Sequence, residues 1–386
     1  MNIVSCQKKN YLGNNKVRLF QSGLVKMKLV NYRNHKIFTI DPPIGPVAIV
    51  GSNGAGKTNI IEGISLFSAG KGIRRAKFAD MIAFGECGFS VSAHLYSNKG
   101  FTTEIATSFN IQSKQRKTRV DGENGLGGVH FAKKMSLLWL GPGMDRLFTD
   151  SPSTRLRYID RLFSGIDINH AGWVTNYSRL LRQRSFVLKT NANETSWLNA
   201  LEIKLAELAV IVASSRLDIT NKIISMMHKD EDFFPTPEIL FKGRVENMLE
   251  SGNSLDTEKQ LADIWKSNRT KDLYTGGSEI GVHRSDFQVF DKKRTVSAQL
   301  CSTGEQKALL IAIILAAAKV ISFRDGQTPI LLLDEVFAHL DEDYKLFLSN
   351  EIISLGAQVW MTGSAVDNFD CFKKKCEIFK LKNNKG

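Results

Sequence analysis

One stretch of eight residues has the types and spacing that bind the phosphates of a nucleotide. It reads Gly51-Ser52-Asn53-Gly54-Ala55-Gly56-Lys57-Thr58, the complete pattern G-x-x-x-x-G-K-T. Its glycines let backbone N–H groups turn inward onto phosphate oxygens. The pattern places Lys57 on the β- and γ-phosphates and the Thr58 hydroxyl on a magnesium ion. The sequence therefore predicts a site for a nucleoside triphosphate, ATP, with Mg²⁺.

The segments on either side of this loop are the ones that such a site needs. Residues 47–50 (VAIV) are a short apolar β-type run, and residues 59–67 carry apolar side chains at helical spacing. A helix N-terminus adds partial positive charge to the loop. A glycine-rich surface turn is the alternative for the same residues, and the strand and helix argue against it. We count Asn59, in the first turn of the helix, among the nucleotide-binding residues.

A second apolar run, residues 330–333 (ILLL), ends in the acidic pair Asp334-Glu335. We expect Asp334 to hold Mg²⁺ and Glu335 to polarise the attacking water as a general base. Glu335 and Lys57 are therefore the predicted catalytic residues. The alternative is a buried strand that ends in two solvated acids.

A third motif has features of another phosphate-facing helix start. It reads Ser302-Thr303-Gly304-Glu305-Gln306-Lys307 and leads directly into an apolar run, residues 308–315. One phosphate rarely needs two such helix ends from one chain. We therefore expect a dimer in which each subunit presents residues 302–305 to the nucleotide on the other. An ordinary N-cap with an acidic first turn is the alternative interpretation.

The three motifs, in this order, resemble the ABC-type ATPase superfamily, in the branch with SMC-like heads rather than the transporter branch. The resemblance narrows to the bacterial RecF family of recombination-repair proteins and covers residues 24 to 365. Its most specific stretch is S-T-G-E-Q-K-A-L-L, residues 302–310. The other segments that carry it are residues 29–35, 58–62, 143–163 and 281–286.

The resemblance implies an ATP-driven homodimer that binds DNA at single-strand/double-strand junctions and hydrolyses ATP weakly. It implies a role in recombinational repair, replication-fork maintenance and the SOS response, in the cytoplasm. The partners that it implies are RecR- and RecO-like proteins and no membrane. The implied fold is α/β: an ABC-type head, with a mixed sheet and an antiparallel β subdomain, split by a mainly helical inserted lobe.

The order of patterns along the chain agrees with a split head. We predict a flexible basic extension over residues 1–23, a head over 24–140 and 272–386, and the inserted lobe over 141–271. Residues 89–95 and 103–109 are β-type runs that predict an antiparallel meander, closed by a loop over 122–128. Residues 145–230 are helical in pattern, and Gly276-Gly277 marks the predicted return to the head.

Composition limits the class of protein and of partner. The 386 residues are 42% hydrophobic, enough for a sizeable core, and carry a net charge of +13. Such an excess predicts a polyanion, either nucleic acid or an anionic membrane surface, and the motifs favour DNA. Five scattered cysteines fit a reducing compartment. The longest apolar run, residues 308–318, is too short to span a membrane and predicts a buried helix.

Basic residues that are candidates for DNA phosphate contact fall into three groups. Aromatic and basic residues are not abundantly interleaved, so recognition of the DNA backbone is favoured over base reading. Arg74 or Arg75 is alternatively a contact of the γ-phosphate. The groups are Arg74, Arg75 and Lys77; Arg155, Arg157, Arg161, Arg179, Arg182 and Arg184; and Lys292, Lys293 and Arg294.

Two rival functions stay open at this point. An ABC transporter ATPase subunit would carry a switch histidine, and residues 358–364 contain none. That leaves γ-phosphate sensing to other groups, such as Thr362, while Asp341 is a candidate for the dimer seam. A nucleotide-gated DNA scaffold without catalysis is the second rival, and measured hydrolysis separates it from an ATPase.

Overall fold

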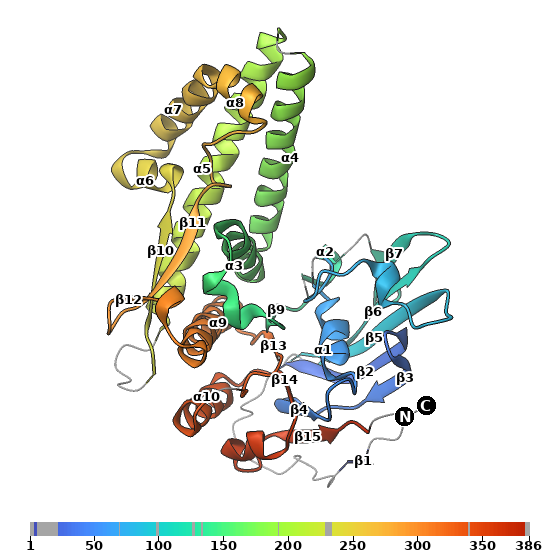
Figure 1. Ribbon diagram of the computed structural model, residues 1–386. Coiled ribbons are helices and arrows are strands. Elements are labelled where there is room, and N and C mark those ends of the chain that lie inside the picture. Colours follow the sequence, from blue (N-terminus) through green and yellow to red (C-terminus); the bar gives the residue numbers. More distant parts are fainter. Residues whose placement is uncertain are drawn as a thin grey trace. The chain divides into compact units, whose positions relative to one another are not determined.

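The computed structural model describes residues 4–5, 22–68, 70–97, 100–125, 128–132, 134–191, 193–227, 234–338 and 340–382 (Figure 1). The chain divides into two compact units. Unit 1 holds Met1–Met144, Asp232–Phe234 and Ile314–Gly386, and unit 2 holds Asp145–Glu231 and Pro235–Ile313. Apart from residues 4–5 and 22–23, the predicted basic extension over 1–23 lies outside the described residues.

A mainly parallel sheet forms the centre of unit 1. Its strand order is β1-β15-β4-β14-β13-β9, and every neighbouring pair is parallel except β1 with β15. The strands are β1 (Val4–Ser5), β4 (Pro46–Val50), β9 (Leu137–Leu140), β13 (Ile330–Leu333), β14 (Val359–Gly363) and β15 (Glu377–Lys380). Strands β4, β9, β13 and β14 are fully buried, which is why the first three are continuous apolar runs, while β14 includes the buried Thr362. The two predicted strands on either side of the site, β4 and β13, are confirmed.

The second sheet of unit 1 is antiparallel and has the order β3-β2-β5-β6-β7-β8. Its strands are β2 (Gly23–Tyr32), β3 (His35–Ile40), β5 (Gly88–Tyr96), β6 (Thr102–Asn110), β7 (Gln115–Val120) and β8 (Glu123–Gly125). The predicted meander is confirmed, but the closing loop over 122–128 is wrong, because residues 123–125 form β8. Asp121 and Gly122 both have positive φ (48° and 84°), which is the geometry of a tight hairpin turn.

Helices complete unit 1. They are α1 (Lys57–Ser65), the short α2 (Val129–Ala132) and α10 (Glu342–Leu355), with the 3₁₀ turns η1 (Phe78–Met81) and η4 (Asp367–Phe372). Helix α9 (Thr303–Asp325) contributes to both units, since the boundary falls between Ile313 and Ile314. By length and composition α9 would suffice to cross a membrane, yet most of its apolar window is buried within the protein. It is a core helix, as predicted.

Unit 2 combines long helices with a small sheet (Figure 1). Its helices are α3 (Pro152–Ile166), α4 (Ile168–Thr190), α5 (Thr195–Ser225), α6 (Arg244–Ser251), α7 (Ser254–Ser267) and α8 (Arg269–Thr275), with the 3₁₀ turns η2 (Met144–Thr149) and η3 (Ala298–Leu300). The sheet is β10 (Pro237–Lys242), β11 (Asp286–Asp291) and β12 (Val296–Ser297), all antiparallel. The prediction of helices over 145–230 is confirmed by α3, α4 and α5, while residues 228–230 lie outside the described residues.

One boundary of the compact units differs from the predicted domains. The sequence predicts residues 272–313 to be part of the head, with Gly276-Gly277 as the return point, but they group with unit 2. The reason is pairing that is distant in sequence: β11 forms six antiparallel pairs with β10. Asp286, the first residue of β11, also accepts hydrogen bonds from Arg155 of α3. The return to unit 1 occurs within α9, and residues 302–305 therefore belong to unit 2.

Candidate nucleotide-binding site

The glycine loop between β4 and α1 has the backbone that the motif predicts. Gly54 and Gly56 have φ values of 84° and 93°, in the left-handed region that favours glycine. At Gly56 space is also lacking, because an added Cβ would lie 2.6 Å from His35 Nε2 and 2.7 Å from Asn34 Nδ2. Around Gly54 nothing lies within 4 Å of an added Cβ. Backbone conformation therefore favours glycine at both positions, and lack of space requires it at Gly56 as well.

Lys57 is the first residue of α1 and is buried. Its Nζ donates to the carbonyl oxygens of Gly51 (2.7 Å) and Ser52 (3.1 Å), so the ammonium group lies against the loop backbone. The N-cap residue Gly56 offers no side chain, and the first turn of α1 carries no acid. The helix N-terminus is therefore able to receive an anion next to the Lys57 charge.

Two hydroxyl groups converge on the carboxylate of Asp334, which follows β13. Thr58 Oγ1 donates to Asp334 Oδ1 and Oδ2 at 3.1 and 3.0 Å, and Thr362 Oγ1 on β14 donates to Oδ1 at 2.5 Å. The predicted metal residues, Thr58 and Asp334, are thus brought together across 276 positions. Hydroxyl and carboxylate oxygens are the ligands that Mg²⁺ takes, so the donor set fits this ion.

The environment of Asp334 opposes its charge. Burial raises the pKa of this carboxyl above its ordinary value, and the nearby Glu335 charge raises it further. The hydrogen bonds from Thr362 and Thr58 act in the opposite direction but do not outweigh burial. A bound cation would favour the ionised form, which is the form that ligates a metal.

Glu335, the predicted general base, has a constrained backbone and an exposed side chain. Its φ is 49°, a left-handed conformation that is uncommon for a residue other than glycine. Its N–H donates to Thr362 Oγ1 at 2.8 Å. Thr362 therefore links the backbone of Glu335 to the carboxylate of Asp334. The predicted role of Thr362 in γ-phosphate sensing stays a prediction.

A buried ionic cluster lies behind the loop, and the sequence patterns did not predict it. Glu62 of α1 is fully buried and accepts hydrogen bonds from Arg33 Nε (2.8 Å) and Nη2 (2.6 Å). Arg74 Nη1 lies 3.6 Å from the same carboxylate and donates to Asn59 Oδ1 at 2.9 Å. Asn59 in turn donates to Asn34 at 2.8 Å. An acid on an otherwise apolar helix face was the signal that could have revealed it.

The third motif forms a reciprocal capping box at the start of α9. Ser302 N donates to Glu305 Oε2 (2.8 Å), and Glu305 N donates to Ser302 Oγ (3.3 Å). Arg294 Nη1 pairs with Glu305 Oε1 at 2.8 Å. Burial disfavours the Glu305 charge, but the bonds from Ser302 and Arg294 outweigh it and hold the pKa of Glu305 below normal. This box agrees with the alternative interpretation of the motif, an ordinary N-cap with an acidic first turn. The predicted contact with a second subunit stays a prediction.

Two of the predicted DNA contacts are wrong. Arg155 is buried, and its guanidinium donates to Asp286 at 2.8 to 2.9 Å. Arg184 is fully buried and pairs with Glu202 (2.9 Å) and Asp272 (2.6 Å). A charge in the core must be paired: the Arg155 pair joins α3 to β11, and the Arg184 pairs join α4 to α5 and α8.

The remaining predicted contacts keep their standing as predictions. Arg157, Arg179 and Arg182 are exposed. Arg294 is half-exposed, and besides Glu305 it pairs with Asp291 at 2.6 Å. Asp341, the proposed seam residue, caps α10 by accepting from Tyr344 N at 2.8 Å.

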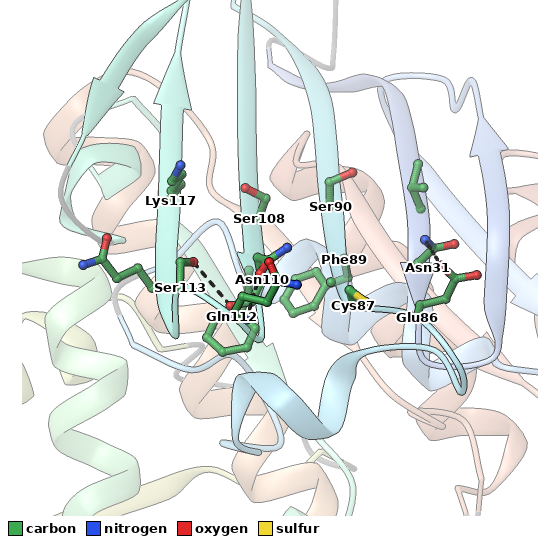
Figure 2. Close-up of a pocket in the computed structure, with 14 residues that line it drawn as sticks. Asn31, Glu86, Cys87, Phe89, Ser90, Ser108, Asn110, Gln112, Ser113 and Lys117 are labelled. Atoms are coloured by element: carbon green, nitrogen blue, oxygen red, sulfur yellow. Dashed lines mark hydrogen bonds between the residues drawn. The ribbon is translucent and has the colours of Figure 1, made fainter.

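A separate hollow of about 600 Å³ lies on the outer face of the antiparallel sheet (Figure 2). Ser90, Ser108 and Lys117 form its floor from three neighbouring strands. Glu86 lies at its edge and accepts from Asn31 Nδ2 at 3.0 Å. Its lining includes none of the predicted nucleotide-binding residues, which follow β4 of the parallel sheet.

The sequence matches the RecF/RecN/SMC N terminal domain family over residues 23–385. The DNA replication and repair protein RecF of Rickettsia canadensis is 35% identical over 353 residues, which cover 92% of this chain and 97% of that protein. The RecF protein of Mesorhizobium japonicum is 35% identical over 366 residues, covering 94% and 96%. A solved structure of the recombination mediator protein RecF-ATP in the RecFOR pathway has a TM-score of 0.79 at 23% identity, covering 90% of this chain and 93% of that one. That likeness confirms the predicted head fold.

Proposed function

Because this chain belongs to the RecF family of DNA replication and repair proteins, we propose that it is an ATP-driven homodimer that clamps DNA at single-strand/double-strand junctions. Its work would be recombinational repair and replication-fork maintenance in the cytoplasm, with RecR- and RecO-like proteins as partners. The observation that carries the proposal is the meeting of Lys57, Thr58 and Asp334 at one edge of the parallel sheet.

The P-loop and α1 would hold the triphosphate of ATP. Lys57 would exchange its carbonyl partners for phosphate oxygens, since an ammonium group prefers an anion to a neutral carbonyl. Thr58 and Asp334 would hold Mg²⁺, which neutralises charge on the phosphate oxygens when it is bound there. The residues proposed to contact the nucleotide within one chain are Gly51, Ser52, Asn53, Gly54, Ala55, Gly56, Lys57, Thr58 and Asn59.

Glu335 would act as the general base for hydrolysis. Its carboxylate, on a side chain exposed to solvent, would orient a water molecule and accept its proton. The bond from its N–H to Thr362 Oγ1 fixes the backbone of Glu335, which limits the positions that its carboxylate can take. Thr362 is therefore a positioning residue in this proposal.

The second half of each site would come from the other subunit. In the single chain, Ser302 and Thr303 are exposed at the N-terminus of α9, where the helix dipole adds partial positive charge beside the first-turn acid Glu305. Dimer closure would place this helix start against the partner's nucleotide, so binding favours the closed state and hydrolysis releases it. Turnover would be slow, because the site is complete only in the closed dimer.

Substituting the general base tests dimer closure. We expect Glu335→Gln to retain ATP and accumulate as a dimer, because binding is intact and hydrolysis is blocked. Gel filtration with ATP and Mg²⁺ measures this, and Lys57→Ala under the same conditions should remain a monomer. A Glu335→Gln protein that stays monomeric at micromolar concentration while binding ATP would contradict closure. Undiminished hydrolysis would remove Glu335 from its proposed role.

A further inference from the structure

The segment Gly281-Val282-His283-Arg284-Ser285-Asp286 belongs to unit 2, and most of its polar groups point into buried contacts. Val282 O accepts from Arg216 Nη1 at 2.7 Å. Ser285 Oγ donates to the buried carboxylate of Glu246 at 2.7 Å, and Asp286 pairs with Arg155. The exception is Arg284, whose side chain is exposed. The segment is therefore anchored by buried contacts and exposes the side chain of one arginine, Arg284.

The position of Arg284 is fixed by its neighbours. Burial lowers the pKa of His283, so its ring is neutral, with Nε2–H donating to Ser278 O (3.0 Å) and Nδ1 accepting from Tyr177 OH (2.8 Å). Arg284 Nε donates to the same carbonyl of Ser278 at 3.0 Å. A side chain at Gly281 would meet Tyr177 OH at 2.2 Å, so glycine is required there. The guanidinium of Arg284 is thus held in place before any ligand binds.

Helix α4 faces this segment across a groove of about 460 Å³. The 23 residues of α4 include four basic residues and no acid. Three side chains that line the groove, Arg182, Phe186 and Lys189, follow at steps of four and three along α4 and so lie on one helix face. The other side consists of Gly276, Gly277, Ser278, His283 and Arg284.

The groove has the charge and shape to receive a chain of phosphates. Its described lining includes three cationic side chains and no carboxylate. Glu279, close to the groove in sequence, is paired with Lys271 at 2.5 Å. Two adjacent glycines leave the wall without bulky side chains. Phe186 lies between Arg182 and Lys189 on this helix face and is 63% exposed, so its ring is accessible to a ligand.

We propose that the groove between α4 and residues 276–284 binds single-stranded DNA, with Arg182, Lys189 and Arg284 on the phosphates and a base stacked on Phe186. The proposal rests on the DNA-binding function above and names the surface that performs it. Cationic side chains around an exposed aromatic ring are the features that bind single strands without sequence preference. A duplex keeps its base faces stacked and cannot offer one to Phe186. A single strand is therefore the occupant that uses both features.

The charged residues are tested by a triple variant, Arg182→Ala, Lys189→Ala and Arg284→Ala. We expect its affinity for a labelled oligothymidylate, measured by anisotropy with ATP, to fall at least tenfold. The slope of log affinity against log salt should decrease by about 2, since each phosphate contact on a single strand contributes about 0.7. The control variant replaces three exposed lysines of the antiparallel sheet, Lys26, Lys28 and Lys36, and removes the same charge.

The stacking contact is tested by Phe186→Ala. We expect it to weaken oligothymidylate binding by about 5- to 100-fold and to leave duplex binding unchanged. The control is Phe101→Ala, a ring that is 73% exposed in unit 1. All of the changed side chains are exposed, and each variant is first required to match the wild-type melting temperature and ATP affinity. Lys189→Glu alone replaces the triple variant if that protein fails to fold.

The outcomes separate this inference from the proposed function. If the wild-type chain binds DNA and the groove variants bind it as well as their controls do, the assignment of DNA to this groove is wrong. The proposed DNA clamp is then unaffected. If wild-type protein with ATP binds no DNA, the clamp itself fails. If the triple variant weakens duplex and single strands equally and Phe186→Ala changes neither, the assignment to a single strand is overturned.

Discussion

At the scale of single residues, the proposed metal-binding role of Asp334 and the folding of the chain have opposite requirements. A metal ligand must be ionised, while burial raises the pKa of this carboxyl and favours its neutral form. In the chain without ligand, the stability that Asp334 contributes is fully present below the ordinary pKa of an aspartate. It is lost as the pH rises through the raised pKa of the folded state.

Asp334→Asn should therefore stabilise the ligand-free protein at neutral pH. The amide oxygen still accepts from Thr58 and Thr362, and the cost of a buried charge disappears. Thermal unfolding without nucleotide should give a higher Tm than wild type at pH 7, and the difference should shrink as the pH falls through the raised pKa. The same variant should lose Mg²⁺-dependent ATP binding. A lower Tm at neutral pH would contradict this description of the site.

Residue types and spacing predicted the contact of Thr58 with Asp334, because the P-loop motif and the acidic strand end each carry a known chemistry. They did not predict the buried ion pair between Glu62 and Arg33, although both residues lie close to the loop in sequence. An acid inside a helix pattern is usually a solvated residue, so the position of Glu62 on an otherwise apolar helix face was the one signal of its burial, and the sequence does not name its partner. For the same reason the sequence does not distinguish Arg184, which is buried, from Arg182, which is exposed, and both are candidates for DNA contact.

At the scale of elements, the loop between β4 and α1 depends on two glycines in the left-handed region. Gly54→Ala adds backbone strain alone, of about 1–3 kcal/mol. Gly56→Ala adds the same strain and a collision with His35 and Asn34. We expect Gly56→Ala to lower the free energy of unfolding more than Gly54→Ala and to abolish ATP binding. Denaturant titration and nucleotide fluorescence measure the two effects, and equal losses in both variants would contradict the collision.

The helices of unit 2 depend on paired charges in their core. Arg184→Ala leaves Asp272 and Glu202 without this partner, although Glu202 keeps its contact with Arg269. We expect a loss of about 3–5 kcal/mol in the free energy of unfolding. Arg182→Ala, two residues away and exposed, should change it by less than about 0.5 kcal/mol. Denaturant titration of both variants tests this contrast, and a stable Arg184→Ala protein would show that the cluster is dispensable.

At the scale of the whole molecule, the order of motifs predicted a split ATPase head, but not where the split ends. Apolar runs identified β4 and β13, since buried parallel strands need no polar face. The pairing of β11 with β10 joins segments about fifty residues apart, and no local pattern encodes it. That pairing assigns residues 302–305 to unit 2, so the P-loop and the capping box belong to different compact units.

The central claim is that a complete site needs two chains, and mixing two inactive variants tests it most directly. Lys57→Ala removes the P-loop half, and Ser302→Arg blocks the other half. If the sites form between subunits, a heterodimer of the two retains one intact pair, and the mixture should hydrolyse ATP well above the sum of the separate proteins. If hydrolysis stays at that sum while the two variants still associate, each site is built within one chain. The proposed ATP site shared between two subunits is then wrong.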